Sequence, residues 1–177
     1  KETISIPIVD ISVAAGVNGY INSDYPDVIN NIKLPSSMVK ASAQYFCVKT
    51  KGDSMAPTIL DSSYVILRLL ERQEWNDIPD RQIYVISDNS GKAYLKRIKN
   101  RLTKGFIVCM SDNVDKSNYP NFNLQVDEIN SILRAEWYIS AKMPDINDTI
   151  YKRINDLEDK YDQLENRLSQ LGKNPKK

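Results

Sequence analysis

The stretch KGDSMAPTILDSSYVIL, residues 51–67, joins a short turn to an apolar strand. Gly52 and Pro57 are residues that favour turns, whereas the run that begins at Tyr64 is typical of a buried β-strand. Ser54 therefore stands on a turn ahead of a strand, where its side chain is a helix cap, an ordinary loop hydroxyl or a nucleophile. The groups that can remove its proton decide among these three roles.

The rest of the first 140 residues follows the same pattern of short strands and turns. Six runs rich in apolar and β-branched residues predict strands at 45–50, 63–70, 82–87, 92–99, 105–111 and 128–140. Turn sequences such as SDNSGK and NRLTKG separate them, as in hairpins. The sequence therefore predicts a mostly β fold, a partly open barrel or sandwich of short and mainly antiparallel strands.

The beginning of the chain is less regular. Residues 2–13 alternate apolar and polar side chains around Pro7 and predict an edge strand. The segment AAGVNGY after them, with its small residues and glycines, predicts a loop, and residues 21–43 are polar and irregular.

The composition limits the classes of function open to this chain. Its 177 residues carry 24 basic and 23 acidic side chains, a net charge of +1, so no overall positive field marks a nucleic-acid-binding protein. No stretch approaches the roughly 18 consecutive apolar residues of a membrane span, and no signal sequence opens the chain. Cys47 and Cys109 lie in apolar runs and predict buried thiols in a cytoplasmic protein. Two cysteines make no zinc site, and we expect no metal or other cofactor.

The chain contains no histidine. Ser-His-Asp and Cys-His catalysis are thereby excluded within it, so a nucleophilic Ser54 needs another base. Lysine can serve once burial lowers the pKa of its ammonium group from about 10.4. In KAYLKRIKN, strand alternation puts Lys96 on one face between Tyr94 and Ile98, which makes it the best desolvated cation of this segment. Lys96 is therefore the candidate base, and a surface lysine with its stem along apolar neighbours is the alternative.

The chain contains GDSMAPTILDSSYVIL, KAYLKRIKN and IVCMSDNVDKSNYP, in this order. As a set, these segments resemble the LexA and phage-repressor family of self-cleaving Ser-Lys peptidases, the S24 family, over roughly residues 5–140. The resemblance implies a LexA-like fold in which Ser54 is the nucleophile and Lys96 is the catalytic base. The two residues are 42 positions apart, with extra length in ERQEWNDIPDRQ.

The resemblance also implies a substrate within the same chain. Members of the family carry a bond between two small residues upstream of the serine, and SVAAGVNGY supplies one between Ala15 and Gly16, 38 residues before Ser54. Small side chains let a backbone enter a narrow cleft, and a glycine after the bond permits a sharp kink. We expect a cleavage-loop segment over about residues 10–43, within an autoproteolytic domain of residues 1–143.

These residues suggest a mechanism. Neutral Lys96 takes the proton of Ser54, and Ser54 attacks the carbonyl of Ala15. Lys96 then returns a proton to the leaving amine of Gly16. Backbone N–H groups of the turn are expected to hold the oxyanion. The turn comprises Gly52, Asp53, Ser54 and Met55.

The resemblance implies two partners, a RecA-type nucleoprotein filament and DNA. It implies that a RecA-type nucleoprotein filament favours the docked cleavage loop. It also implies that DNA is bound only through a helix-turn-helix domain upstream of Lys1, because residues 1–177 contain no recognition helix and no basic stripe.

After Pro144 the sequence changes to the pattern of a coiled-coil helix, with large apolar residues at spacings of four and three. One series, at position d, comprises Ile150, Leu157, Leu164 and Leu171; the other, at position a, comprises Ile154, Tyr161 and Leu168. Arg153 and Lys160 fall at g and Glu158 and Glu165 at e, as in a parallel homodimer. We expect this coiled coil over residues 144–172 and a flexible tail over 173–177; the alternative is a solvated helix that folds back on the core.

Three other functions are consistent with parts of this pattern. A UmuD-like accessory of a translesion polymerase shares the fold, the dyad and the cleavage, but has only a short arm upstream. A signal peptidase also uses a serine and a lysine, but needs a membrane anchor and a glycine-rich segment after its lysine. A catalytically silent dimerisation module would keep Ser54 and Lys96 in a misaligned arrangement.

Overall fold

The computed structural model describes residues 2–16 and 30–172. The chain divides into two compact units, Lys1–Met143 and Pro144–Lys177. The first unit is built on a β-sheet, and the second contains the helix α2 (Ile146–Gly172). The predicted mostly β fold with a C-terminal helix is therefore confirmed.

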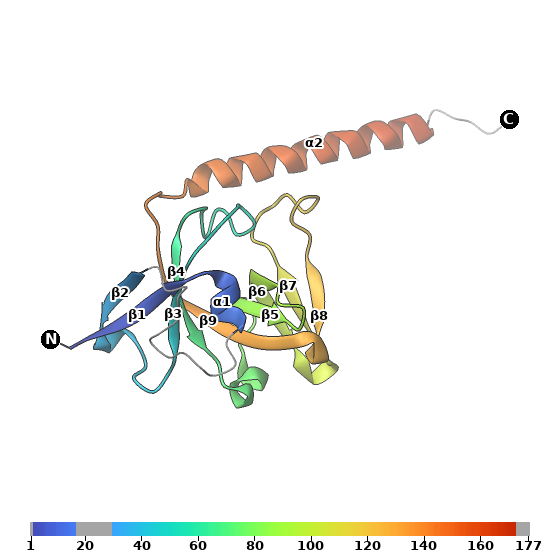
Figure 1. Ribbon diagram of the computed structural model, residues 1–177. Coiled ribbons are helices and arrows are strands. Elements are labelled where there is room, and N and C mark those ends of the chain that lie inside the picture. The colour runs from blue at the N-terminus through green and yellow to red at the C-terminus, as the bar shows by residue number, and fades with distance from the viewer. Residues whose placement is uncertain (1, 17–29, 173–177) are drawn as a thin grey trace. The chain divides into compact units, whose positions relative to one another are not determined.

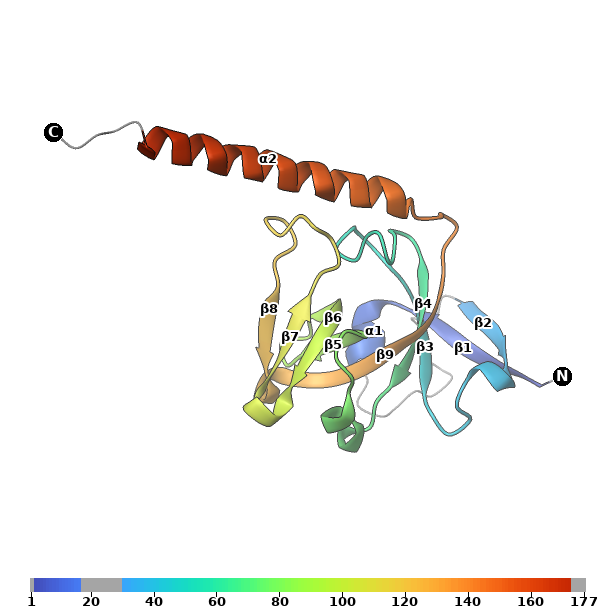
Figure 2. The same ribbon diagram turned by 180° about the vertical axis from the view of Figure 1, so that it is seen from behind.

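The strands of the described residues form one sheet (Figures 1 and 2) in the order β2-β1-β3-β4-β9-β5-β6-β7-β8. Their bounds are β1 Thr3–Val9, β2 Asn30–Pro35, β3 Tyr45–Lys49, β4 Tyr64–Leu69, β5 Ile83–Asp88, β6 Ala93–Arg101, β7 Phe106–Met110, β8 Phe122–Gln125 and β9 Ile129–Ile139. Neighbouring strands are antiparallel except β1 and β3, which are parallel. The long strand β9 pairs with both β4 and β5 and so joins the two halves of the sheet.

Short 3-10 helices occupy several connections between these strands. They are η1 Ser36–Met38, η2 Arg72–Asp77, η3 Leu102–Lys104 and η4 Val126–Glu128. The six strands predicted between residues 45 and 140 correspond to β3, β4, β5, β6, β7 and β9. Two strands, β2 and β8, were not predicted, because each is short and contains only two large apolar residues.

The prediction of an edge strand over residues 2–13 is wrong in two respects. First, β1 lies inside the sheet, because β2 pairs with it on one side and β3 on the other. Second, the strand ends at Val9, and a short helix, α1 (Ile11–Gly16), replaces both its predicted end and the beginning of the predicted loop. The remainder of AAGVNGY lies outside the described residues.

A cap and a buried face explain why α1 forms. The Asp10 carboxylate accepts hydrogen bonds from the backbone N–H and the hydroxyl of Ser12, and the Asp10 carbonyl accepts one from the N–H of Ala14. The bond to the Ser12 N–H satisfies a backbone donor that a helix start otherwise leaves free, and the bond from Ala14 closes the first turn. Ala14 and Ala15 are fully buried against the sheet, so the small side chains that predict a loop instead let the helix pack closely.

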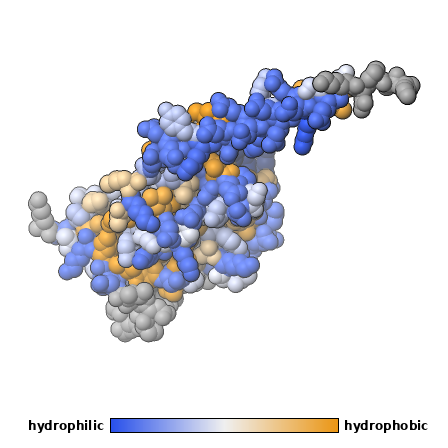
Figure 3. All heavy atoms as spheres, turned by 90° about the horizontal axis from the view of Figure 1, so that it is seen from above, coloured by the Kyte–Doolittle hydropathy of each residue, from blue (hydrophilic) through white to orange (hydrophobic). Residues whose placement is uncertain are grey.

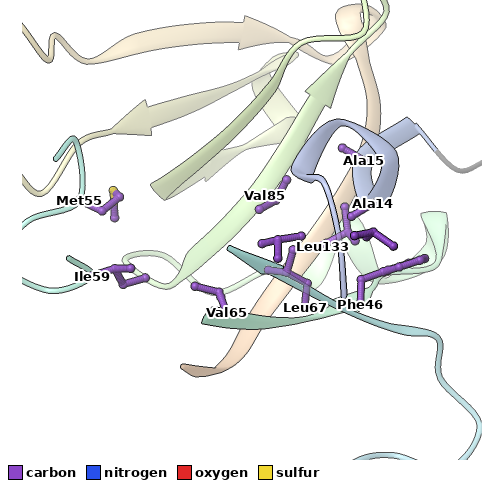
Figure 4. Close-up of a cluster of buried hydrophobic side chains, with 11 residues drawn as sticks. Ala14, Ala15, Phe46, Met55, Ile59, Val65, Leu67, Val85 and Leu133 are labelled. Carbon is purple, nitrogen blue, oxygen red and sulfur yellow. The ribbon is translucent and has the colours of Figure 1, made fainter. Parts of the chain in front are cut away.

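The buried side chains of residues 2–16 and 30–172 form three clusters, and the one that concerns the site contains the alanines of α1 (Figure 4). In this cluster Ala14 and Ala15 lie at one end, near Phe46, and Met55 and Ile59 lie at the other. Cys47 and Cys109 are free and buried, and burial raises their thiol pKa to about 11 and about 12 respectively. Both are therefore buried, as predicted, and remain neutral thiols near neutral pH.

The second unit consists of α2 and the residues that flank it. Among the described residues, no helix is both long enough and apolar enough to cross a membrane.

Candidate active site

Ser54 lies on the turn between β3 and β4. The turn begins at Gly52, whose φ of +84° is in the left-handed region that a side chain disfavours. The N–H of Gly52 donates to the carboxylate of Asp61 at 2.7 Å, which fixes the start of the turn. This bond makes Gly52 unsuitable as an oxyanion donor. Within the described part of the chain, the N–H groups of Ser54 and Met55 donate to no other residue and remain available.

A second segment, the loop after β7, holds the same turn in place. The side-chain amide of Asn113 donates to the Asp53 carbonyl at 2.8 Å, and the Asn113 backbone N–H donates to the Ser54 carbonyl at 3.0 Å. Asp53 therefore helps to fix the turn through its backbone carbonyl, which accepts the bond from Asn113. Met55 is buried and belongs to the core cluster as well as to the wall of the site.

Lys96 approaches Ser54 from the middle of β6, which pairs with β5 on one side and β7 on the other. Its Nζ lies 3.0 Å from the Oγ of Ser54, within hydrogen-bond distance. Ile98, on the same face, is fully buried, and Tyr94 packs against the same cluster. The alternation of β6 thus places Lys96 among apolar neighbours, as its sequence predicts.

Burial lowers the pKa of Lys96 below the 10.5 of an exposed lysine, and the nearby ammonium of Lys116 acts in the same direction. A Cys109 thiolate would oppose this shift, but burial keeps that thiol neutral near pH 7, and the carboxylate of Asp112 opposes the shift as well. Arg97, however, holds that carboxylate through two hydrogen bonds of 2.7 and 2.6 Å, and Thr58 donates a third at 2.6 Å. Burial alone would raise the pKa of Asp112, but these bonds keep it below its usual value. The Asp112 charge is therefore largely compensated, and Lys96 can lose its proton more readily than an exposed lysine.

A cleft of about 280 Å³ opens beside the Ser54–Lys96 pair. Asp10 and Ile11, at the beginning of α1, form part of its wall. Residues 49–52 and residues 93–96 line other parts of it. The cleft therefore lies between the serine turn, the lysine strand and the point at which the chain enters α1.

The bond between Ala15 and Gly16 lies elsewhere. The Ala15 carbonyl accepts hydrogen bonds from the hydroxyls of Ser131 at 2.7 Å and Ser87 at 2.8 Å, and from the amide of Asn130 at 3.3 Å. Ala15 does not line the cleft, and Figure 4 shows it at the end of the cluster opposite Met55, the neighbour of Ser54. The structure thus brings Ser54 and Lys96 together but leaves the predicted scissile bond apart from them.

We call the three donors on the Ala15 carbonyl, Ser87, Asn130 and Ser131, the carbonyl clasp. Sequence reasoning did not identify these residues, nor Asn113, nor the Arg97–Asp112 pair. Within residues 2–16 and 30–172, no group of three His, Cys, Asp or Glu side chains could hold a metal ion.

The comparison with protein families agrees with this geometry. The model of the Peptidase S24-like family matches residues 7–133, which is more than two thirds of the chain and includes the serine turn, the lysine strand and the clasp. A search of curated proteins found no match. The chain therefore belongs to the Peptidase S24-like family.

Proposed function

We propose that this chain is the self-cleavage and dimerisation part of a LexA-like or prophage transcriptional repressor, and that it cuts its own bond between Ala15 and Gly16. The observation that supports the proposal most strongly is the 3.0 Å contact between Lys96 Nζ and Ser54 Oγ in a setting that lowers the lysine pKa. A serine activated by a neighbouring base is the arrangement that nucleophilic acyl transfer requires.

The reaction proceeds in two halves. Neutral Lys96 accepts the Ser54 proton while Oγ bonds to the Ala15 carbonyl carbon, and the oxyanion forms beside the free N–H groups of Ser54 and Met55. Lys96 then gives its proton to the Gly16 nitrogen as the peptide bond breaks, which leaves Ala15 esterified to Ser54. Water deprotonated by Lys96 hydrolyses this ester and returns Ser54 to its starting form.

The chain must change its conformation before it can react, because the Ala15 carbonyl is held by the clasp. The end of α1 has to leave the sheet and enter the cleft, whose wall already includes Asp10 and Ile11. We propose that a RecA-type nucleoprotein filament favours this docked state. In the same proposal DNA is bound through a helix-turn-helix domain outside residues 1–177, and the protein acts in the cytoplasm.

Self-cleavage kinetics of the native chain, Ser54→Ala and Lys96→Ala at about pH 7.5 and about pH 10 test this function. We expect cleavage that is faster at the higher pH in the native chain and is absent from both variants. Cleavage that persists in Lys96→Ala with an unchanged pH dependence would contradict the proposed base.

A silent dimerisation module is the second candidate, and the clasp is the observation that favours it. A chain that never reacts would also keep Ala15 away from Ser54. Addition of a RecA filament separates the two candidates, because a silent module stays intact in its presence whereas a repressor that awaits activation is cut.

A further inference from the structure

The helix α2 carries a continuous apolar stripe that its own unit does not cover. The stripe consists of Ile150, Ile154, Leu157, Tyr161, Leu164, Leu168 and Leu171. Their side chains are 43–73% exposed, and α2 contains no buried residue. The helix has 27 residues, so it is about 40 Å long.

The apolar stripe of α2 is narrow, and its width indicates what kind of partner surface can pack against it. Its members occupy only the a and d positions of three heptads, and the other large apolar residues of α2, Ile146 and Tyr151, lie near its beginning. Positions b, c and f are polar: Asn155, Asp156, Asp159, Asp162, Gln163, Asn166, Ser169 and Gln170. In Figure 3 the visible face of α2 is mostly hydrophilic, with hydrophobic atoms along its edges. A helix that docks on a globular surface needs a broader apolar face, whereas an a/d seam fits one similar helix.

The charges beside the seam determine the direction of the partner. Arg153 and Lys160 are at g, and Glu158 and Glu165 are at e. In a parallel pair, g faces the e position five residues further along the other helix, so Arg153 meets Glu158 and Lys160 meets Glu165. In an antiparallel pair, g faces g and e faces e, and these positions would place like charges together.

The seam residues favour two strands over three. Position d holds leucine in three of its four places, which is typical of parallel dimers. Of the three seam residues at a, Ile154 is β-branched, as in such dimers, whereas Tyr161 and Leu168 are not. Asn147 occupies the first a position, where a polar side chain fixes the register of two helices.

We propose that α2 forms a parallel, in-register, two-stranded coiled coil with α2 of a second copy of this chain. Both copies then carry their β units at the same end of the coil. This inference goes beyond the proposed proteolysis and does not depend on it, because no residue of the seam lies near Ser54 in the sequence or takes part in its chemistry.

The oligomeric state of the full Ser54→Ala chain, measured by sedimentation equilibrium, tests the pairing without interference from cleavage. We expect a particle of twice the 20.2 kDa chain mass. A monomer throughout the concentration series would overturn the proposal, as would a three-chain particle.

A matched pair of variants shows whether the seam holds the dimer. Leu157→Asp with Leu164→Asp places two charges in the seam and should weaken dimerisation by at least about a hundredfold. Asn155→Asp with Asn166→Asp adds the same charges at outer positions and should leave the dimer intact. A dimer that survives the seam change, with the β unit folded by near-UV circular dichroism, would place the interface elsewhere.

Disulfide cross-linking tests the direction. Leu168→Cys should cross-link to itself in a parallel pair, whereas an antiparallel pair, in which a residues pack against d residues, would instead cross-link Leu168→Cys to Ile150→Cys in a mixture of the two variants. Because the native cysteines are buried, the introduced thiols react selectively. Cross-links of the mixed type alone would refute the parallel arrangement.

Discussion

Removal of the carbonyl clasp should accelerate self-cleavage. Ser87 and Ser131 donate to the Ala15 carbonyl at 2.8 and 2.7 Å, and their side chains are almost fully buried. Their hydroxyls also lie 2.7 Å from each other, so one can satisfy the other when α1 leaves. The clasp therefore stabilises the conformation in which Ala15 is away from Ser54, relative to the conformation that reacts.

The size of the effect follows from the number of bonds. A buried neutral hydrogen bond contributes about 0.5–1.5 kcal/mol net, so the two hydroxyls together contribute about 1–3 kcal/mol. If the reactive conformation is the minor one, this difference changes its population by about five- to 150-fold, and the cleavage rate changes by the same factor. Ser87→Ala with Ser131→Ala should therefore be cut faster than the native chain by a factor in this range.

Intact-mass spectrometry over time at about pH 10 measures the rate. Ser63→Ala is a matched control, because Ser63 is also buried but its hydroxyl has no hydrogen-bond partner in the described structure. We expect the control to be cut at the native rate. A clasp variant that folds normally and is cut no faster than the control would refute the reasoning.

Four further predictions concern the dyad and its turn. Because burial lowers the pKa of Lys96, the cleavage rate should rise with pH, and the pH at which it is half-maximal should lie below 10.5. A midpoint at or above that value would contradict the role of burial. Between the lowered Lys96 pKa of the folded chain and the ordinary lysine pKa of the unfolded chain, the unfolded chain binds more protons. The free energy of unfolding, measured by urea titration, should therefore rise with pH across this window in the native chain and rise less in Lys96→Met. Asn113→Ala removes the amide that holds the Asp53 carbonyl without adding a charge near Lys96. It should slow cleavage by about tenfold or more without moving the pH midpoint, because it displaces Ser54 and leaves the base unchanged; an unchanged rate would exclude a positioning role. Gly52→Ala forces a side chain into the left-handed region and should lower the free energy of unfolding by about 1 kcal/mol or more, whereas an equally stable variant would show that the turn relaxes freely.

Local sequence patterns predicted the central strands and the dyad for identifiable reasons. The absence of histidine reduced the candidate bases for Ser54 to lysine, and the alternation of β6 then separated Lys96 from Arg97 and Lys99. Both inferences depend on residues within a few positions of each other. Tyr94 and Ile98, the apolar residues that flank Lys96 on its face, belong to its own strand, which is why the sequence was sufficient there.

The clasp and the support of the serine turn could not be predicted in this way. Ser87 and Ser131 lie 72 and 116 residues from Ala15, and Asn113 lies 60 residues from Asp53. These contacts arise from the order of strands in the sheet, which no local pattern encodes. A different signal was present for α1, since Asp10 is a typical N-cap residue, but the small residues after it outweighed that signal and led to the prediction of a loop.

The central claim is that Ser54 attacks the carbonyl of Ala15, and the masses of the products test it most directly. The native chain and Ser54→Ala would be incubated side by side at about pH 10 and analysed by intact-mass spectrometry. We predict that the native chain alone yields one fragment that ends at Ala15 and a complementary fragment that begins at Gly16. A cut at another bond, or the same two fragments from Ser54→Ala, would contradict the account.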